Sequence, residues 1–440
     1  MLILKNANVI NFYPPYVKEN IDVVIEDNSI VETGKNISRK YLKEKSIDLS
    51  GKYISPGLVC SHNHFYSVLA RGILARIKPA NNFVEILQNL WWKLDKAIDQ
   101  EILYYSAMIG ALEAIKSGTT SVVDHNSSPS FIKGSLNTIR SCFEKAGLRG
   151  ILCYEITDRN GDKKIRESLK ESEDFISSLE SAKEKNKVSL IEAAVGAHAQ
   201  FTLSDKTLSS ITEIINRTGS GIHIHVCEDK LDAVHAKNNY AKTAIERLEK
   251  FNLLNEKSIL AHGVYLTQKD IRLINRKGSF LVHNPRSNMN NGVGYLKYPG
   301  LVKNTTLGTD GIGSDMLEEF KFAYFKNNES GNEISTGDFL KFIQNGNIIL
   351  ERYFNKKFGN IETGYIADIV VYDYSPPTPL VNENLTGHLA FGFSSSDIES
   401  VIINGRIVYD KRQFPFDISE IYLNARKAAQ RLWKRMDDLK

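Results

Sequence analysis

Two histidines separated by one residue, His62 and His64, are the first side chains in this sequence of 440 residues with an evident capacity for chemistry. They end the stretch 55–64 (SPGLVCSHNH), in which a Pro-Gly turn signal precedes a short apolar run. In a β-strand the side chains of residues i and i+2 point to the same face, so both imidazoles could bind one metal ion. Because two nearby histidines are often incidental, the remaining ligands must come from elsewhere in the chain.

Other residues that could bind a metal or move a proton stand at the ends of later apolar runs. His225 lies near the end of the run 221–226 and Glu228 follows that run, His262 ends the run 258–262, and Asp310 ends the run 306–310. One histidine at a strand end is usually structural, but such groups rarely coincide at four strand ends by chance. Three imidazoles and one carboxylate suit one divalent ion per chain, Zn²⁺ before Fe, and leave a position for water. The predicted ligands are His62, His64, His225 and Asp310.

A metal ion held in this way lowers the pKa of bound water and produces a hydroxide nucleophile near neutral pH. Glu228, three residues beyond His225, could then protonate the ring or the leaving nitrogen of a substrate. Asp310 could accept the proton of the water, and His262 could polarise the attacked centre. We therefore expect a hydrolase that deaminates, or otherwise cleaves a C–N bond in, a small nitrogen heterocycle. Dechlorination, ring or amidine hydrolysis at the same site, and a non-catalytic metal-binding scaffold are the alternatives.

Several neighbouring residues have competing interpretations. His223 shares a strand face with His225 and is a rival ligand, but His225 lies nearer the strand end and precedes Glu228. His125 and His283 also fall near strand ends, where they are expected to be structural or to line the pocket. We expect the two cysteines beside the ligands to serve in packing; they are Cys60 and Cys227. We expect the same of at least one of Trp91 and Trp92.

These residues need a scaffold that gathers the ends of several strands. Between residues 58 and 310, β-like apolar runs alternate with segments of helical period. The predicted strands start at residue 58 and continue with 119–125, 149–154, 188–195, 221–226, 258–262, 279–283 and 306–310. Eight alternations of strand and helix predict an α/β protein with a (β/α)8 TIM-like barrel, in which catalytic groups stand at the carboxyl ends of the strands.

Short β-like runs also occur at both ends of the chain, at 2–4, 21–25 and 29–32 and again at 368–372 and 400–409. The N-terminal runs are too short for an independent domain, so they need strands from elsewhere. We predict a small composite β-sandwich domain made of residues 1–55 and 359–440, which includes an amphipathic C-terminal helix from residue 420. The metal-dependent hydrolase barrel would then comprise residues 56–358.

Composition excludes several classes of protein. A hydrophobic content of 42% and a charged content of 25% are ordinary for a globular protein, and the net charge of +4 is spread along the chain, so no nucleic-acid surface is expected. No apolar stretch is long enough to span a bilayer, and the N-terminus lacks a secretion signal. The four cysteines include no Cys-x-x-Cys pair and are expected to be reduced thiols. We expect a cytoplasmic enzyme for a small-molecule substrate, with a homodimer as the default assembly.

These motifs together resemble the amidohydrolase superfamily, and within it the group of metal-dependent deaminases and chlorohydrolases. The segments that carry the resemblance occur in the family's order: 56–64 (PGLVCSHNH), 69–72 (LARG), 223–228 (HIHVCE), 260–263 (LAHG) and 307–311 (LGTDG). The segments 284–291 (NPRSNMNN) and 310–316 (DGIGSDM) are similar to the SsnA-type aminohydrolases, which implies a purine-derived substrate.

The resemblance covers nearly the whole chain and implies the same single metal site, with Glu228 and His262 beside the ion. Relatives with two metals carry a carboxylated lysine on the fourth strand, and residues 188–195 contain no lysine, which favours one ion. Arg71, Asp95 and His198 fall where relatives contact their substrates, although Asp95 stands in place of the usual glutamate.

Overall fold

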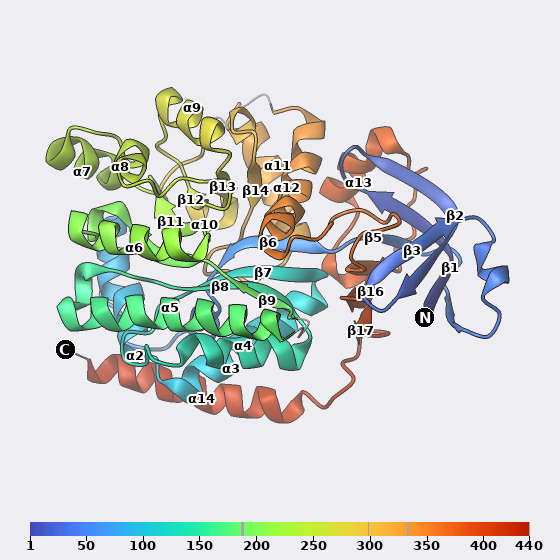
Figure 1. The fold of residues 1–440 in the computed structure, drawn as a ribbon, viewed down its shortest axis with the longest axis horizontal. Helices are drawn as coiled ribbons and strands as arrows, with labels where there is room; N and C mark the ends of the chain where they lie inside the picture. Colours follow the sequence, from blue (N-terminus) through green and yellow to red (C-terminus); the bar gives the residue numbers. More distant parts are fainter. Residues whose placement is uncertain (186–188, 298, 332–333, 440) are drawn as a thin grey trace.

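The computed structural model describes residues 1–185, 189–297, 299–331 and 334–439. Figure 1 shows a larger part, in which strands are surrounded by helices, and a smaller part rich in strands on the right of the view. The smaller part combines segments from the two ends of the chain, since its blue strands lie beside orange and red ones.

Within the described residues, the strands of the larger part form two parallel sheets. The first has the order β6–β7–β8–β9 and the second the order β10–β11–β12–β13–β14. Isolated parallel bridges between Asn63 and Asp310 and between Ile156 and Ala197 join the edges of the two sheets. The strand bounds are β6 (Leu58–Asn63), β7 (Thr119–Asn126), β8 (Arg149–Tyr154), β9 (Ile191–Ala193), β10 (Val195–Ala199), β11 (Ile222–Val226), β12 (Ile259–His262), β13 (Phe280–His283) and β14 (Thr305–Leu307). The prediction of an α/β fold is thereby confirmed.

The fourth predicted strand differs most from its expected form. Instead of one strand over 188–195, the chain forms β9 and β10 on either side of Ala194, one in each sheet, and Val188 lies outside the described residues. Gly196 of β10 passes so close to β8 that a Cβ there would lie 2.4 Å from the carbonyl oxygen of Tyr154. The small residues of β10 therefore permit a close approach of two backbones where the sheets meet.

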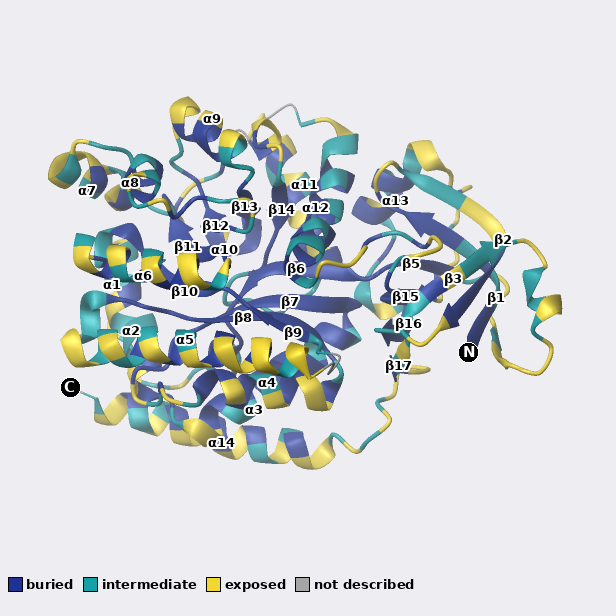
Figure 2. Ribbon diagram, in the orientation of Figure 1, coloured by how far each residue is buried: buried dark blue, intermediate teal, exposed yellow. Residues whose placement is uncertain are grey.

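Helices cover the outside of the parallel strands. In Figure 2 their outward sides are exposed and their inward sides are buried, as expected for amphipathic helices. A π-helical turn at Leu87–Trp91 joins α1 to α2 within the continuous helical segment 83–97. The bounds are α1 (Phe83–Ile86), α2 (Trp92–Ala97), α3 (Gln100–Lys116), α4 (Ser135–Ala146), α5 (Asp162–Glu184), α6 (Asp205–Thr218), α7 (Lys230–Tyr240), α8 (Ala244–Lys250), α9 (Gln268–Lys277), α10 (Pro285–Asn290), α11 (Met316–Glu329) and α12 (Thr336–Phe354).

Strands from both ends of the chain share one mixed sheet in the smaller part. Its order is β17–β16–β15–β5–β1–β2–β3, and β4 pairs with β1. The central strand β5 runs parallel to β1 and antiparallel to β15. The bounds are β1 (Leu2–Asn11), β2 (Tyr16–Glu26), β3 (Ser29–Gly34), β4 (Lys45–Asp48), β5 (Tyr53–Pro56), β15 (Ile369–Tyr372), β16 (Ile398–Ile403) and β17 (Arg406–Tyr409), with α13 (Leu385–Phe391) beside them.

The C-terminal helix α14 (Ser419–Asp438) leaves this sheet and lies along the larger part, below α3 in Figure 1. The Trp433 indole donates to the carbonyl of Leu69 at 3.1 Å, and the Arg435 guanidinium donates to the carbonyl of Ala97 at 2.7 Å. The helix is thus anchored to the larger part, although the predicted domain division groups it with the terminal segments.

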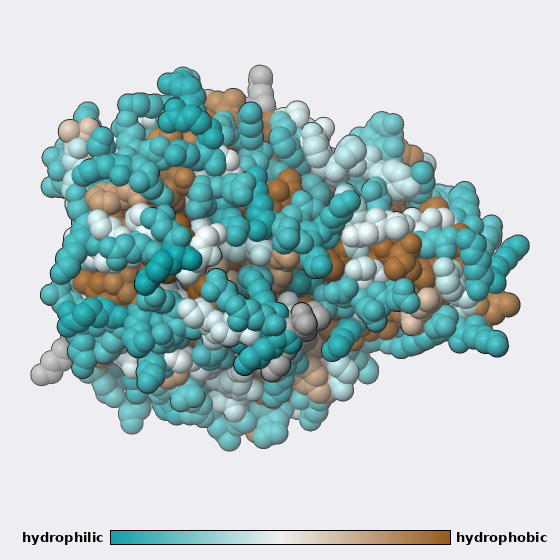
Figure 3. Space-filling view, in the orientation of Figure 1, coloured by the Kyte–Doolittle hydropathy of each residue, from teal (hydrophilic) through white to brown (hydrophobic). Residues whose placement is uncertain are grey.

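The outer surface is mostly hydrophilic with scattered apolar patches on the face shown in Figure 3. Among the helices of the described residues, none combines the length and the apolar character needed to cross a bilayer.

A buried ion pair joins the two parts. The Arg149 guanidinium at the start of β8 donates to both carboxylate oxygens of Asp368, at 2.9 and 3.0 Å, and only 3% and 5% of the two side chains are exposed. The backbone N–H of Asn404 also donates to Asp368, at 2.6 Å, and the guanidinium stacks over the ring of Phe358. The pair therefore ties the first parallel sheet to β15 and the turn between β16 and β17.

We expect Arg149→Met to lower the free energy of unfolding by about 3–5 kcal/mol, because Asp368 would keep a buried charge without its partner. The control is Arg140→Met, which removes an exposed pair with Glu144 and should cost less than about 1 kcal/mol. Urea denaturation followed by circular dichroism measures both. Equal, small losses in the two variants would show that the buried pair does not hold the parts together.

Candidate active site

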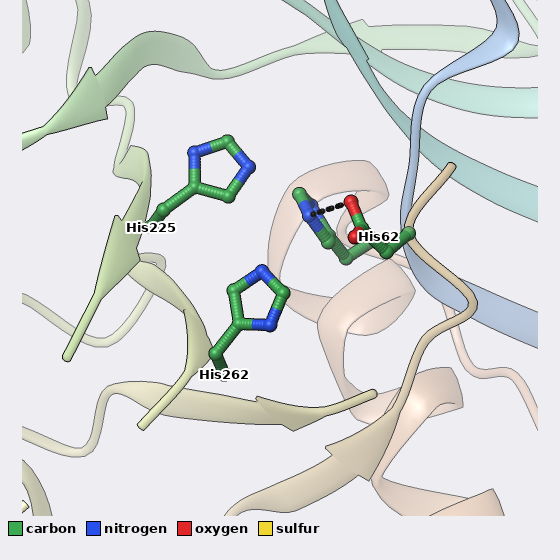
Figure 4. A group of neighbouring side chains, drawn as sticks. His62, His225 and His262 are labelled. Carbon is green, nitrogen blue, oxygen red and sulfur yellow. Dashed lines mark ion pairs between the residues drawn. The ribbon is translucent and has the colours of Figure 1, made fainter. Parts of the chain in front are cut away.

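Four predicted metal ligands meet at one end of the parallel strands. His62 belongs to β6, His64 follows it, His225 belongs to β11 and Asp310 follows β14. The His64 Nε2 atom lies 2.9 Å from Asp310 Oδ1 and 3.2 Å from His225 Nε2, and His62 Nε2 lies 3.3 Å from Asp310 Oδ1. Figure 4 shows the imidazoles of His62, His225 and His262 arranged around a common space, with the ion pair to His62 dashed.

These atoms have the separations expected of ligands around one ion. Ligand atoms about 2.0–2.2 Å from a tetrahedral ion lie roughly 3.3–3.5 Å from each other, close to the distances observed here. The Nε2 atoms of His62 and His262 are buried and have no hydrogen-bond partner within the described ranges. The side chains present therefore fit a bound metal ion.

Hydrogen bonds on the far side of the rings leave the facing nitrogens free. His64 Nδ1 lies 2.7 Å from the carbonyl oxygen of His125, and His225 Nδ1 lies 2.7 Å from that of His198. A carbonyl only accepts, so each Nδ1 carries a proton, and when both rings are neutral each Nε2 presents a lone pair toward the other ring. Two lone pairs 3.2 Å apart repel each other unless a cation lies next to them.

Titration behaviour agrees with a site that attracts cations. Burial disfavours the charged imidazolium of His64, yet its hydrogen bond to Asp310 and the charge of that carboxylate raise the His64 pKa to about 9. For His62 burial dominates over the same carboxylate and lowers its pKa to about 3. The environment thus favours one positive charge between His64 and Asp310 and a neutral imidazole at His62.

The rival ligand His223 lies behind the cluster. Its Nε2 is 2.8 Å from His62 Nδ1, so it contacts the opposite edge of the His62 ring. The geometry favours His225 over His223 as a ligand. The ligand atoms of His62, His225, His262 and Asp310 also lie within 4.8 Å of one another, which places His262 at the same centre.

Helix α10 holds three of the predicted catalytic groups. Ser287 donates to Asp310 Oδ2, Asn288 Oδ1 lies 2.9 Å from His262 Nδ1, and Asn291, just past the helix, donates to Glu228 Oε1 at 3.4 Å. The helix begins with Pro285 at its first position, where the missing N–H costs nothing. One short helix therefore orients groups that come from three different strand ends.

Glu228, the predicted proton donor, lies beside this cluster. Its Oε2 lies 3.6 Å from His262 Nε2, and 14% of its side chain is exposed. Burial raises the pKa of Glu228 to about 7, against the lowering influence of His262, so the carboxyl can hold or release a proton near neutral pH.

The backbone is strained at the same place. Cys227, His262 and Asp310 have φ angles of 49°, 72° and 53°, in the left-handed region that non-glycine residues seldom adopt. Each stands at or just beyond the end of a parallel strand, where the chain must turn sharply to aim a functional side chain.

A cavity of about 790 Å³, including its open mouth, adjoins the cluster. His198 and Asp95, both predicted to contact substrate, line it, and so do the aromatic rings of Trp91, Trp92 and Phe201. Two charged residues not singled out from the sequence, Glu155 and Arg159, line it as well.

Known proteins resemble this chain over most of its length. The model of the family described as "Amidohydrolase family" matches residues 53–408. This chain belongs to the amidohydrolase family. A 5-methylthioadenosine/S-adenosylhomocysteine deaminase of Thermococcus sibiricus is 33% identical, over 92% of this chain and 93% of the relative. A 5'-deoxyadenosine deaminase of Methanopyrus kandleri is 29% identical, over 95% and 96% of the two chains.

Solved structures share the fold of this amidohydrolase. An adenosine deaminase from Xanthomonas campestris with bound zinc has a TM-score of 0.83 at 21% identity and covers 98% of both chains. The atrazine chlorohydrolase TrzN from Arthrobacter aurescens has a TM-score of 0.81 at 20% identity, covering 98% of this chain and 100% of the other. The predicted family and the predicted class, a hydrolase acting on C–N bonds other than peptide bonds, are confirmed.

One predicted substrate contact lies apart from the others in this amidohydrolase. Arg71 is not among the residues that line the cavity, and its guanidinium is bound to both carboxylate oxygens of Glu113, at 2.9 and 2.6 Å. With 62% of its side chain exposed, it faces a separate surface hollow near Gly313. The substrate contact of Arg71 stays a prediction that this geometry does not support.

Among the site residues that the sequence did not single out, Glu155 occupies a position from which it could have been predicted. Glu155 directly follows the third strand, so the rule that singled out His262 and Asp310 applies to it equally. Ser287, Asn288 and Asn291 lie in a motif that was recognised for its family resemblance, but neutral polar side chains gave no sign of their contacts.

We expect Asn288→Leu to change the tautomer of His262. In the metal-free protein Asn288 favours the form with the proton on Nδ1, because the amide oxygen accepts it; without that oxygen the Nε2–H form should become substantially populated. Nitrogen-15 NMR of histidine-labelled protein measures the ratio. Asn290→Leu, on the exposed side of the same helix, is the control. An unchanged ratio in Asn288→Leu would rule out this orienting role.

Proposed function

We propose that this amidohydrolase is a deaminase that hydrolyses the exocyclic C–N bond of a small, purine-like nitrogen heterocycle with one metal ion per chain. The observation that carries the proposal is the convergence of His62, His64, His225 and Asp310 next to Glu228 and His262. The names of the relatives, which are deaminases of adenosine derivatives, support a purine ring. The structural likeness to a guanine deaminase of C. acetobutylicum, at a TM-score of 0.78 and 20% identity, supports the fold.

The metal would be held by His62, His64, His225 and Asp310. When bound, a divalent ion such as Zn²⁺ supplies Lewis acidity that turns water into a nucleophile at neutral pH. Zinc is favoured because the facing donors are imidazole nitrogens and one carboxylate oxygen. Ser287 fixes Oδ2 of Asp310, so its Oδ1 is the atom directed at the ligand histidines.

Glu228, His262 and Asp310 would move the protons. Asp310 takes the proton released by the attacking water, and Glu228 delivers a proton to the ring nitrogen or to the leaving amine. Before the reaction, His262 carries its proton on Nδ1, which faces Asn288. Its Nε2 must therefore take up a proton before it can polarise the attacked centre. Glu228, 3.6 Å away and 14% exposed, can pass that proton from solvent to His262 before the substrate binds, and it then takes up a second proton for the ring nitrogen or the amine.

Asp95 and His198 would contact the substrate inside the cavity. His198 is buried, with Nδ1 3.0 Å from Thr202 Oγ1, and Asp95 accepts a hydrogen bond from Ser127 at 3.1 Å. Trp91 and Trp92 would provide flat surfaces for a heteroaromatic ring.

We also infer that the two parallel sheets close into one (β/α)8 barrel spanning residues 56–358, with a composite β-sandwich domain built from 1–55 and 359–440. The bridges Asn63–Asp310 and Ile156–Ala197 and the likeness to the Xanthomonas campestris enzyme support the barrel. The mixed sheet shared by both chain ends supports the composite domain.

Replacing Glu228 by Gln should reduce kcat/KM for ammonia release at least about 100-fold, because the proton donor is lost, while bound metal stays unchanged. Ammonia release from a panel of purines and pyrimidines and elemental analysis measure the two quantities. The exposed Glu213→Gln serves as a control with the same change of charge. Full turnover by the Glu228 variant would refute its role as the acid and base.

The wild-type protein should bind one metal ion firmly per chain, because β9 and β10 contain no lysine that could be carboxylated to bridge a second. His64→Ala should lose the firmly bound ion, whereas His235→Ala, outside the cluster, should retain it. Inductively coupled plasma mass spectrometry after dialysis gives the counts. Two firmly bound ions in the wild type would contradict the single-metal site.

A further inference from the structure

Beyond the ligand cluster, the cavity contains a second charged group made of Asp95, Glu155 and Arg159, which we call the charge triplet. We propose that the charge triplet selects heterocycles whose substituent is uncharged or cationic and donates hydrogen bonds, and that it rejects substituents bearing a carboxylate or a phosphate. This inference rests on the proposed deaminase and specifies its substrate class.

The Arg159 guanidinium already interacts with both carboxylates of the triplet. Its Nη2 donates to Glu155 and lies 3.7 Å from Asp95 Oδ2, and its Nε donates to Thr157 Oγ1 at 3.1 Å. The guanidinium also stacks on Trp92, 4.6 Å from the ring centroid. A ligand anion would therefore compete with two protein carboxylates for one cation.

Next to the Arg159 guanidinium, Asp95 offers a hydrogen-bond acceptor that has no partner among the described residues. Asp95 Oδ1 is buried and has no hydrogen-bond partner in the part of the chain that the structure describes, while Oδ2 accepts from Ser127. The Tyr66 hydroxyl lies near enough to lower the pKa of Asp95 without forming a regular hydrogen bond to it. Because Asp95 lines the cavity and is 3% exposed, a hydroxyl or amino group of a bound ligand is the donor that this oxygen fits.

The net charge of the triplet also favours an uncharged or cationic substituent. With both acids ionised, the triplet carries two negative charges and one positive charge. Two other acids of the lining are engaged elsewhere: Asp229 accepts from the N–H of Leu231 at 2.8 Å at the start of α7, and Asp232 accepts from the N–H of Cys227 at 2.6 Å. Arg159 is the only arginine or lysine among the described residues that line the cavity, so an anionic substituent would have to share its guanidinium with Asp95 and Glu155.

Burial raises the pKa of Asp95 to about 7, with Arg159 lowering it and Glu155 raising it. A cationic substituent would stabilise the ionised carboxylate in the way that Arg159 does, whereas an anionic one would add to the repulsion from Glu155. With Asp95 ionised, an anionic substituent therefore meets two carboxylates and only one guanidinium.

The test uses the zinc-loaded, full-length protein and three compounds with the same adenine ring: 9-(2-aminoethyl)adenine, 9-(2-hydroxyethyl)adenine and 9-(carboxymethyl)adenine. Dissociation constants come from quenching of tryptophan fluorescence, and kcat/KM from ammonia release. We expect the amino and hydroxyl compounds to bind at least about tenfold more tightly than the carboxylate. Equal or tighter binding of the carboxylate would overturn the proposal.

Two isosteric variants test whether the triplet causes this preference. Glu155→Gln and Asp95→Asn should each reduce the ratio of carboxylate to amine dissociation constants about fivefold or more, because each removes a negative charge beside the substituent. Glu144→Gln is the matched control, since Glu144 also pairs with an arginine four residues away but lies on the surface. Wild-type ratios in both triplet variants would refute the assignment.

The two proposals fail in different ways. Absence of ammonia release from every ring would refute the deaminase, yet the dissociation constants would still report the charge preference. If Glu155→Gln does not fold, as judged by circular dichroism, Asp95→Asn decides the matter, and the wild-type ratio of the three ligands applies in any case.

Discussion

A single carboxylate, Asp310, lies where most of the site's interactions meet. Its Oδ1 faces His62 and His64, and its Oδ2 is held by Ser287 of α10. Buried imidazoles lose the hydration that would stabilise their charge, so they need either neutrality or an anion nearby, and Asp310 is the anion at the centre of this cluster. The left-handed backbone of Asp310 and its bridge to Asn63 bring that carboxylate to the place where the first and the last parallel strands meet. The bridge between Asn63 and Asp310 therefore both joins the edges of the two sheets and positions the central carboxylate of the site.

Supporting residues distinguish this arrangement from a mere group of histidines. Backbone carbonyls fix the protonation of His64 and His225, and α10 orients His262, Glu228 and Asp310 from the opposite side. These outer contacts determine which nitrogen of each ring carries a proton and which presents a lone pair. Burial then brings the pKa of Glu228 to about 7, where one carboxyl can serve both as acid and as base.

The sequence sufficed for the parts of the site that follow a simple geometric rule. His62, His64, His225, His262 and Asp310 could be predicted to converge because polar groups at the ends of parallel strands meet at one edge. The same rule covers Glu155, but its partner Arg159 lies in a loop whose course depends on tertiary contacts. Arg71 shows the limit most clearly, since its loop after β6 directs it to Glu113, and no local pattern encodes that direction.

Elements without a hydrophobic period were equally hard to predict. Helix α10 is six residues long and rich in asparagine, so neither length nor amphipathicity marks it. The fourth strand was predicted too early in the chain because β10 contains Gly196 and two alanines, which have low β propensity. The nearby backbone of Tyr154 leaves no room for a Cβ at Gly196.

The mixed sheet of the smaller part has a consequence for how the chain is made. Ser55 and Tyr372 lie side by side across β5 and β15, their hydroxyls 3.0 Å apart, although 317 residues separate them in the chain. During synthesis β1 to β5 emerge from the ribosome before the parallel strands, yet β15, the strand that pairs with the free edge of β5, emerges only after them. The opening strands must wait, with an unpaired edge, while the segments that carry every ligand of the site emerge and begin to fold. The mixed sheet is thus completed only when β15 pairs with β5, and the slowest step of assembly is expected to be the closing of that long loop.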